Sequence, residues 1–348
     1  MYNHKIVYIM CYTIVKRIRN FGCKPIVIAG SINRRVCALS LTVAETRSAG
    51  RDTVLLRLIS SDRLTLPAAA PGAHVTLMLP ENCERQYSIL NPSPDPNCYE
   101  VAVQRESGGR GGSVYLVDML REGDGVTARP PRNLFPLDEH APYSVLIGGG
   151  IGIAPLLAMR RRLIQLQRPY QLHAAFRGLD HLLLGERLAE GQYNMHLDDR
   201  DGGLFPLAST IAAAPREAHL YCCGPVSMIE AFAFAARADG RDETMIHVEY
   251  FASPPAPPAN SSITVELARS GLTVMVPPGR SILDAVREAG VPATSSCENG
   301  TCGACEVHVL AGIPDHFDAV LTPREKLVGD RMMICCSGAL TSRLVIDL

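Results

Sequence analysis

One group of cysteines has a spacing that could bind metal. Its members are Cys297, Cys302, Cys305 and the adjacent pair Cys335 and Cys336. The first three form a C-x4-C-x2-C pattern, which is the spacing of plant-type [2Fe–2S] proteins, where four thiolates surround two irons. Gly300 and Gly303 lie between them and allow a tight turn that brings backbone N–H groups toward the sulfurs. The pattern predicts a [2Fe–2S] cluster.

Two other interpretations of these cysteines fit less well. A zinc site usually has two short C-x2–4-C pairs, and buried free cysteines would not need glycines at this spacing. The choice between Cys335 and Cys336 as the fourth ligand stays open at this point. In an extended segment their side chains would point to opposite sides, so only one of them could face the cluster.

A second set of residues suits the binding of an aromatic ring and a phosphate. In the R-x-Y-S motif of residues 85–88, Arg85 and Tyr87 share one face of an expected strand, so a cation and an aromatic ring can meet one cofactor. A glycine-rich loop, which includes Gly111, Gly112 and Ser113, then opens an expected helix at 114–120. Such a helix start attracts phosphate. An exposed strand and a flexible hairpin loop are the alternatives, and the two motifs together favour phosphate binding.

A third set suits a dinucleotide. The loop at 148–152, with Gly149, Gly150 and Gly152, joins an expected strand to an expected helix, and such a turn lets a pyrophosphate approach the helix start. Downstream, Cys223-Gly224-Pro225 ends another strand and begins a helix, while Cys222 is expected to be a small buried residue. Arg177 follows the second expected strand and could meet either a 2′-phosphate or a ribose.

The distribution of apolar runs and of expected strands and helices along the chain predicts a multidomain α/β and β protein. Short alternating apolar runs across 36–138 indicate an antiparallel β-barrel, and alternating strands and helices across 139–251 indicate a parallel α/β domain. Residues 252–262 form a proline-rich linker before the cysteine-bearing segment 263–348. Residues 1–35 form a basic N-terminal extension, interpreted as a loosely ordered segment.

These motifs, in this order, resemble the phthalate dioxygenase reductase and vanillate demethylase reductase family, which belongs to the ferredoxin–NADP reductase superfamily. The resemblance covers about residues 37–348 and includes the segment 130–137, Pro-Pro-Arg-Asn-Leu-Phe-Pro-Leu. It implies three cofactors: FMN in the barrel, NADH in the α/β domain and a [2Fe–2S] cluster in a C-terminal β-grasp ferredoxin domain. Two positions depart from the family pattern, since Ala154 replaces a threonine and Phe317 replaces an arginine.

The resemblance also implies roles for individual residues. Tyr87 would pack against the flavin, Arg85 would hold its phosphate or ribityl chain, and Ser88 would lie near flavin N5. Cys223 would lie beside the nicotinamide, and Phe251 would complete the terminal E-x-F pattern that begins at Glu249. The family pattern further selects Cys335 as the fourth iron ligand.

The expected function is electron transfer. A flavin can take two electrons as hydride and release them singly, so it belongs between NADH and the cluster, and no acid–base residue is required. The expected partner is a terminal oxygenase, of the Rieske non-haem iron type. The alternatives are another acceptor, such as a cytochrome or a ferredoxin, and a redox sensor without turnover.

Composition sets further limits. The net charge is −1, and residues 1–44 carry basic side chains but no acidic one, so the remainder is acidic and unsuited to nucleic acid. No apolar run is long enough to span a bilayer. Cysteines in a long chain without an export signal indicate a reducing cytoplasm, and a monomer is expected.

Overall fold

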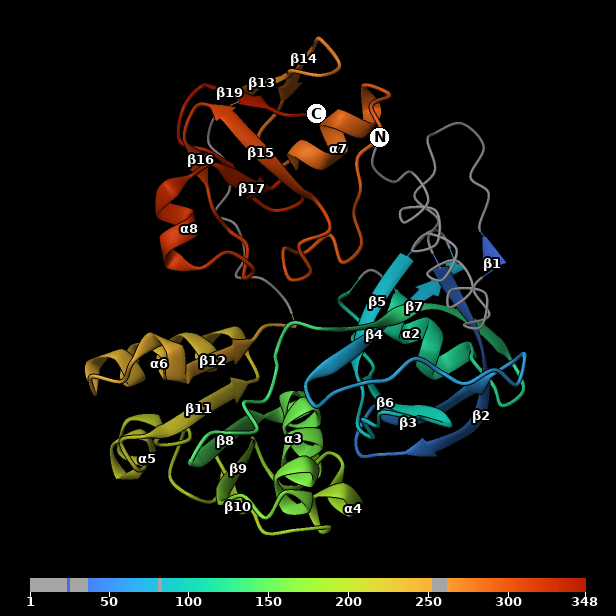
Figure 1. The fold of residues 1–348 in the computed structure, drawn as a ribbon, viewed down its shortest axis with the longest axis vertical. Coiled ribbons are helices and arrows are strands. Elements are labelled where there is room, and N and C mark those ends of the chain that lie inside the picture. Colours follow the sequence, from blue (N-terminus) through green and yellow to red (C-terminus); the bar gives the residue numbers. More distant parts are fainter. Residues whose placement is uncertain (1–23, 26–36, 81–82, 110, 252–261) are drawn as a thin grey trace, which may run out of the picture. The chain divides into compact units, whose positions relative to one another are not determined.

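The computed structural model describes residues 24–25, 37–80, 83–109, 111–251 and 262–348. It divides into two compact units, Met1–Glu249 and Tyr250–Leu348 (Figure 1). The predicted linker lies outside the described residues except for Ser262, and so does most of the N-terminal extension. Lys24–Pro25 (β1) pairs with Cys37 and Ala38 of the first long strand. The predicted domain boundaries remain a prediction.

The first part of unit one is an antiparallel barrel. Its strands are β2 (Cys37–Ser48), β3 (Thr53–Ser60), β4 (Ala73–Leu79), β5 (Cys83–Ser88), β6 (Cys98–Gln104) and β7 (Gly125–Asn133). The sheet order is β5-β4-β7-β2-β3-β6, and an isolated bridge between Ile89 and Val101 links the chain after β5 to β6. Alternate residues such as Val75 and Leu77 fill the barrel core, which is why short alternating apolar runs predict it.

Strand β7 was not predicted, because it contains Pro130 and Pro131, which lack a backbone N–H. The pairing with β4 shifts register at this point: His74 pairs with Arg132 and Thr76 pairs with Arg129. The irregularity accommodates the two prolines within a continuous strand. The helix expected at 114–120 instead begins at Gly112, as α2 (Gly112–Val114), and continues as the π-helix η2 (Tyr115–Met119).

The second part of unit one is a five-stranded parallel sheet in the order β10-β9-β8-β11-β12. Its strands are β8 (Tyr143–Gly149), β9 (Tyr170–Phe176), β10 (Asn194–Leu197), β11 (Ala218–Cys223) and β12 (Ile246–Glu249). Its helices are η3 (Gly150–Gly152), α3 (Ile153–Gln165), η4 (Leu179–His181), α4 (Gly185–Leu188), α5 (Leu207–Ala213), α6 (Val226–Ala238) and η5 (Glu243–Met245). Strands β8, β9 and β11 are apolar over most of their length because helices cover a parallel sheet.

Unit two has a mixed sheet in the order β14-β13-β19-β15-β17 and a small sheet, β16-β18. Its strands are β13 (Ile263–Leu267), β14 (Leu272–Val276), β15 (Glu306–Ala311), β16 (Pro314–Asp315), β17 (Arg331–Met333), β18 (Gly338–Ala339) and β19 (Arg343–Ile346). Helix α7 (Ile282–Glu288) packs on the core, and α8 (Pro323–Val328) begins at a capping box of Thr322 and Glu325. The three predicted fold classes are therefore confirmed.

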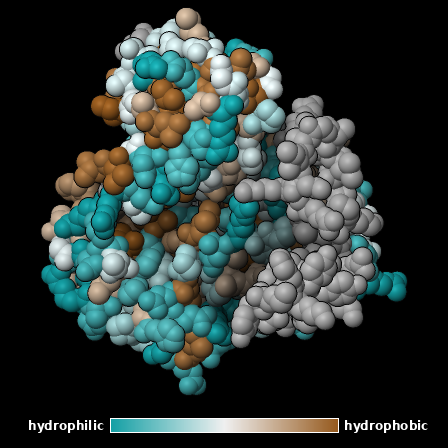
Figure 2. All heavy atoms as spheres, turned by 45° about the horizontal axis from the view of Figure 1, so that its top comes forward, coloured by the Kyte–Doolittle hydropathy of each residue, from teal (hydrophilic) through white to brown (hydrophobic). Residues whose placement is uncertain are grey.

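The face in view in Figure 2 carries apolar as well as polar side chains. Figure 2 shows hydrophobic residues in small groups between hydrophilic residues on the face in view. Among the described residues, no helix is long and apolar enough to cross a membrane.

Candidate cofactor sites

The glycine-rich loop of the barrel meets Arg85 of strand β5. A Cβ atom at Gly112 would lie 2.8 Å from Arg85 Cγ, 3.0 Å from Arg85 Nε and 3.2 Å from Cys83 Sγ. Only glycine leaves room for the arginine at this place, and Gly111 before it has a left-handed φ of 81°. The structure thus brings together the two motifs that predict phosphate binding.

The remaining residues of this site surround the same strand. Tyr87 lies on the same side of β5 as Arg85 and packs against the barrel core, and burial raises the pKa of its phenol. Ser88 is the last residue of β5, it is buried, and its Oγ has no hydrogen-bond partner among the described residues. Ser113 Oγ accepts a hydrogen bond from the Glu106 N–H at 3.0 Å, which ties the helix start to the loop.

The two glycine-containing nucleotide motifs pack against each other. A Cβ at Gly152 would lie 2.4 Å from the carbonyl oxygen of Cys223 and 2.5 Å from the nitrogen of Gly224. A Cβ at Gly149 would lie 2.9 Å from Pro225 Cδ. The carboxyl ends of β8 and β11, with Gly148 paired to Cys223, therefore form one surface at the sheet edge where dinucleotides bind.

Strand β12 adds an acidic residue to this edge. Glu249 pairs with Cys223, and its Oε2 is enclosed without a hydrogen-bond partner among the described residues. Burial raises the pKa of Glu249 to about 8, so the carboxyl group is protonated at neutral pH. Burial and the neighbouring Glu249 raise the pKa of Cys223 well above its usual range, so the thiol is neutral. Cys222, as expected, is fully buried.

Two acidic residues lie beside Arg177. The Asp198 N–H donates to Phe176 O at 2.9 Å, and the Asp199 N–H donates to Arg177 O at 3.1 Å. A Cβ at Gly178 would lie 2.4 Å from Asp199 Oδ2, so this carboxylate occupies the loop after β9. A carboxylate here suits a ribose hydroxyl and disfavours a 2′-phosphate.

The four predicted iron ligands converge in unit two. Cys297, Cys302, Cys305 and Cys335 are all buried. The side chains of Cys297 and Cys302 lie close enough to interact, and so do those of Cys305 and Cys335. Among the described residues, no group of three or more His, Cys, Asp or Glu side chains is arranged to hold a metal ion. The spacing of these cysteines remains that of a plant-type [2Fe–2S] loop.

Backbone N–H groups surround these sulfurs, as the glycines predict. Thr301 donates to Cys297 Sγ at 3.4 Å and Ala304 to Cys302 Sγ at 3.5 Å. Gly300 and Gly303 have φ values of 74° and 73°, which only glycine adopts without strain. Outside the loop, Phe251 is 39% exposed and its carbonyl accepts a hydrogen bond from the Asn299 side chain at 3.2 Å.

Cys335 and Cys336 lie in a turn, and the expectation of an extended segment is wrong. The Met333 carbonyl accepts hydrogen bonds from the N–H groups of Cys336 and Ser337, which closes the turn. Cys335 faces Cys305, and the backbone N–H of Gly300 lies near its thiol. The Cys336 thiol lies 3.7 Å from Met333 O and is half-buried. The positions of the two thiols therefore favour Cys335 over Cys336 as the fourth iron ligand.

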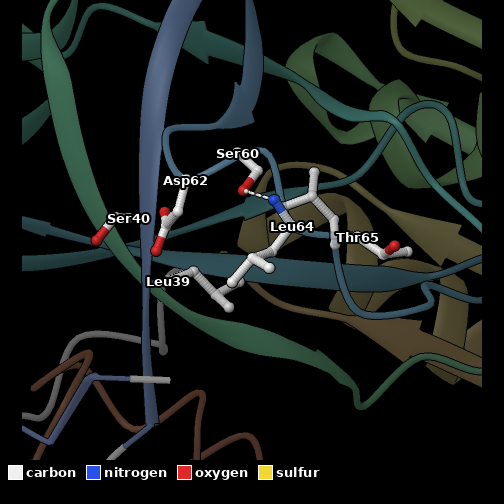
Figure 3. Close-up of a pocket in the computed structure, with 7 residues that line it drawn as sticks. Leu39, Ser40, Ser60, Asp62, Leu64 and Thr65 are labelled. Carbon is white, nitrogen blue, oxygen red and sulfur yellow. Dashed lines mark hydrogen bonds between the residues drawn. The ribbon is translucent and has the colours of Figure 1, made fainter. Parts of the chain in front are cut away.

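A shallow hollow on the barrel lies apart from all the predicted sets of residues. It is lined by Leu39, Ser40, Ser60, Asp62, Leu64, Thr65 and Leu66. The Leu64 N–H donates to Ser60 Oγ at 3.1 Å, which holds the loop after β3 against the strand (Figure 3). We assign the hollow no part in cofactor binding.

The chain is similar to known proteins over most of its length. Residues 265–340 match the model of the 2Fe-2S iron–sulfur cluster binding domain. The chain is 43% identical over 312 residues to phenoxybenzoate dioxygenase subunit beta of Ectopseudomonas oleovorans, covering 89% of this chain and 97% of the relative. The solved structure of phthalate dioxygenase reductase, described as transferring electrons from pyridine nucleotides to [2Fe–2S], is 35% identical, with coverages of 89% and 98% and a TM-score of 0.70.

The chain belongs to the phthalate dioxygenase reductase family. Membership confirms the expected FMN, NADH and [2Fe–2S] cofactors. A further similar structure is an intact type IV self-sufficient cytochrome P450 monooxygenase, which is 32% identical, with a TM-score of 0.77, and is matched over 93% of this chain and 43% of that one.

The residues present fit the cofactors of this family. Gly112 leaves space beside a cationic side chain, Ser88 Oγ is buried without a hydrogen-bond partner among the described residues, and the four predicted iron ligands are buried cysteines. Two features were not predicted: His74, whose Nε2 is buried without a partner among the described residues, and the enclosed carboxyl group of Glu249. The sequence alone does not show either feature, because each one depends on which strands pair in the folded sheet.

Proposed function

We propose that this chain is the reductase component of an oxygenase system, which takes hydride from NADH and delivers single electrons to a separate protein. When bound, the flavin would accept two electrons as hydride and the cluster would accept one electron at a time, so the flavin supplies the step from two-electron to single-electron transfer. The observation that carries the proposal is the presence, in one chain, of the Arg85–Gly112 contact, the Gly152–Cys223 contact and the two pairs of buried cysteines, Cys297 with Cys302 and Cys305 with Cys335.

Each set of residues has a proposed role. The flavin-binding residues are Arg85, Tyr87, Ser88, Gly111, Gly112 and Ser113. The residues proposed for NADH are Gly149, Gly150, Gly152, Cys223, Gly224, Pro225 and Phe251. The iron ligands are Cys297, Cys302, Cys305 and Cys335. These protein groups bind and orient the cofactors, and no side chain is assigned as an acid or base.

The proposed acceptor is a terminal oxygenase of the Rieske non-haem iron type. The name of the relative, a dioxygenase subunit, supports an oxygenase partner. A second candidate acceptor is a haem protein, because the chain is also similar to part of a cytochrome P450 monooxygenase. We further propose a cytoplasmic monomer. The cytoplasmic location is supported by Cys83, Cys98, Cys222, Cys223 and Cys336, which lie outside the proposed cluster and form no disulfide among the described residues.

The test begins with cofactor content. Heating the purified protein should release FMN, and iron analysis should find two irons per chain. The protein should then couple NADH oxidation to product formation when a purified terminal oxygenase is added. Release of FAD would refute the assignment of the flavin. NADH oxidation that reduces a P450 haem but no Rieske oxygenase would favour the second acceptor.

A further inference from the structure

Two buried polar atoms on neighbouring barrel strands lack a hydrogen-bond partner. His74 is 5% exposed and Ser88 is 6% exposed. The His74 Nε2 and the Ser88 Oγ make no hydrogen bond among the described residues, either with each other or with any other group. Buried polar atoms are nearly always hydrogen-bonded, so two unpartnered atoms at one place indicate a missing partner.

The two side chains share one face of the sheet. His74 pairs directly with Ser88 across β4 and β5. The neighbouring Ile89 N–H donates to Ala73 O at 2.9 Å, so the His74–Ser88 pair is of the non-hydrogen-bonded type, in which side chains approach most closely. Val75 fills the barrel core, so His74, its neighbour in β4, points to the outer side of the barrel together with Ser88.

A cationic residue on a third strand lies next to the His74–Ser88 pair. Arg132 of β7 pairs with His74 on the side opposite Ser88. The side chain of Arg132 forms no ion pair among the described residues. Burial, together with the charge of Arg132, lowers the pKa of His74 to about 4, so its ring is neutral at pH 7. A neutral imidazole offers one donor and one acceptor nitrogen.

We propose that His74 is a further flavin-binding residue, which together with Ser88 supplies hydrogen-bond partners for the polar edge of the flavin ring. The inference rests on the proposed function, because Ser88 belongs to the R-x-Y-S motif assigned to FMN. The carbonyl oxygens and ring nitrogens of a flavin offer both donors and acceptors, which match a neutral imidazole and a hydroxyl. A bound water is the competing occupant.

The test compares His74→Leu with His74→Asn by titrating FMN into flavin-free protein. Leucine removes the polar atoms and fills a similar volume, so the Kd for FMN should rise about tenfold. Asparagine keeps a donor and an acceptor and should bind FMN more tightly than the leucine variant. The midpoint potential of the bound flavin should also shift in His74→Leu, which a purely structural residue would not cause.

Thermal unfolding of the flavin-free protein separates binding from folding. Because leucine removes an unpartnered polar atom, flavin-free His74→Leu should be at least as stable as the wild type. The matched control is His173→Leu, since His173 on β9 also has a buried Nε2 without a partner among the described residues. This control should leave the Kd for FMN unchanged.

Wild-type affinity and an unchanged potential in His74→Leu would overturn the inference while leaving the proposed function intact. Weaker FMN binding that follows only from loss of stability, or that His173→Leu reproduces, would also overturn it. Wild-type protein that binds no FMN would instead refute the proposed function.

Discussion

Gly112→Ala tests whether the contact between the glycine-rich loop and Arg85 forms the phosphate site. The new methyl group would lie 2.8 Å from Arg85 Cγ and 3.0 Å from its Nε, so the arginine side chain must move. Gly112 is the first residue of the short helix α2. Thermal unfolding of the flavin-free variant measures any stability lost when Arg85 moves, so that this loss can be separated from a loss of FMN affinity.

The expected loss is in FMN affinity. A hydrogen bond to a charged group contributes about 1.5–3 kcal/mol, which corresponds to a roughly 10- to 150-fold higher Kd for FMN. Fluorescence titration of flavin-free protein measures this Kd directly. Gly108→Ala is the matched control in the same loop, because its methyl group would meet only Glu106 Oε1, at 3.5 Å. Wild-type FMN affinity in Gly112→Ala would refute the assignment of Arg85 to the phosphate.

Three further predictions concern the cluster, the sheet edge and the nucleotide. Cys335→Ser should lose the cluster, while NADH still bleaches the flavin. Cys336→Val should keep two irons per chain. Iron analysis that shows the reverse pattern would make Cys336 the fourth iron ligand in place of Cys335. The pKa of Glu249 is about 8 in the folded protein and ordinarily 4.5, so the folded form retains a proton that the unfolded chain releases. Stability of the flavin-free protein should therefore fall as pH rises from about 4.5 to about 8, by up to roughly 1.4 kcal/mol per pH unit from this group. Glu249→Gln should remove that part of the slope in denaturant titrations, and an unchanged slope would contradict the buried neutral carboxyl group. Comparing kcat/KM should show a preference for NADH over NADPH, because Asp199 occupies the loop beside Arg177; a clear NADPH preference would contradict this assignment.

Motifs with a fixed local geometry could be predicted from the sequence. The spacing of Cys297, Cys302 and Cys305 and the glycines between them predicted a loop whose sulfurs receive backbone N–H groups, and the structure has that loop. The glycines at 148–152 similarly predicted a strand-to-helix turn, since only a short turn of small residues lets a helix begin directly after a strand.

Features that depend on neighbours distant in sequence could not be predicted. Strand β7 was overlooked because Pro130 and Pro131 argue against a strand, and only the shifted register with β4 accommodates them. The turn at Cys336 depends on the Met333 carbonyl. The unpartnered His74 became visible only once β4 was placed between Ser88 and Arg132.

The central claim is that one chain carries electrons from NADH through a flavin to a [2Fe–2S] cluster. Anaerobic titration of the full-length protein with NADH, followed by visible absorbance and by electron paramagnetic resonance on frozen samples, tests it most directly. We expect bleaching of the flavin band together with the signal of a reduced [2Fe–2S] cluster, and only the bleaching in Cys335→Ser. Flavin bleaching without a cluster signal in the wild-type protein would contradict electron transfer from the flavin to the cluster.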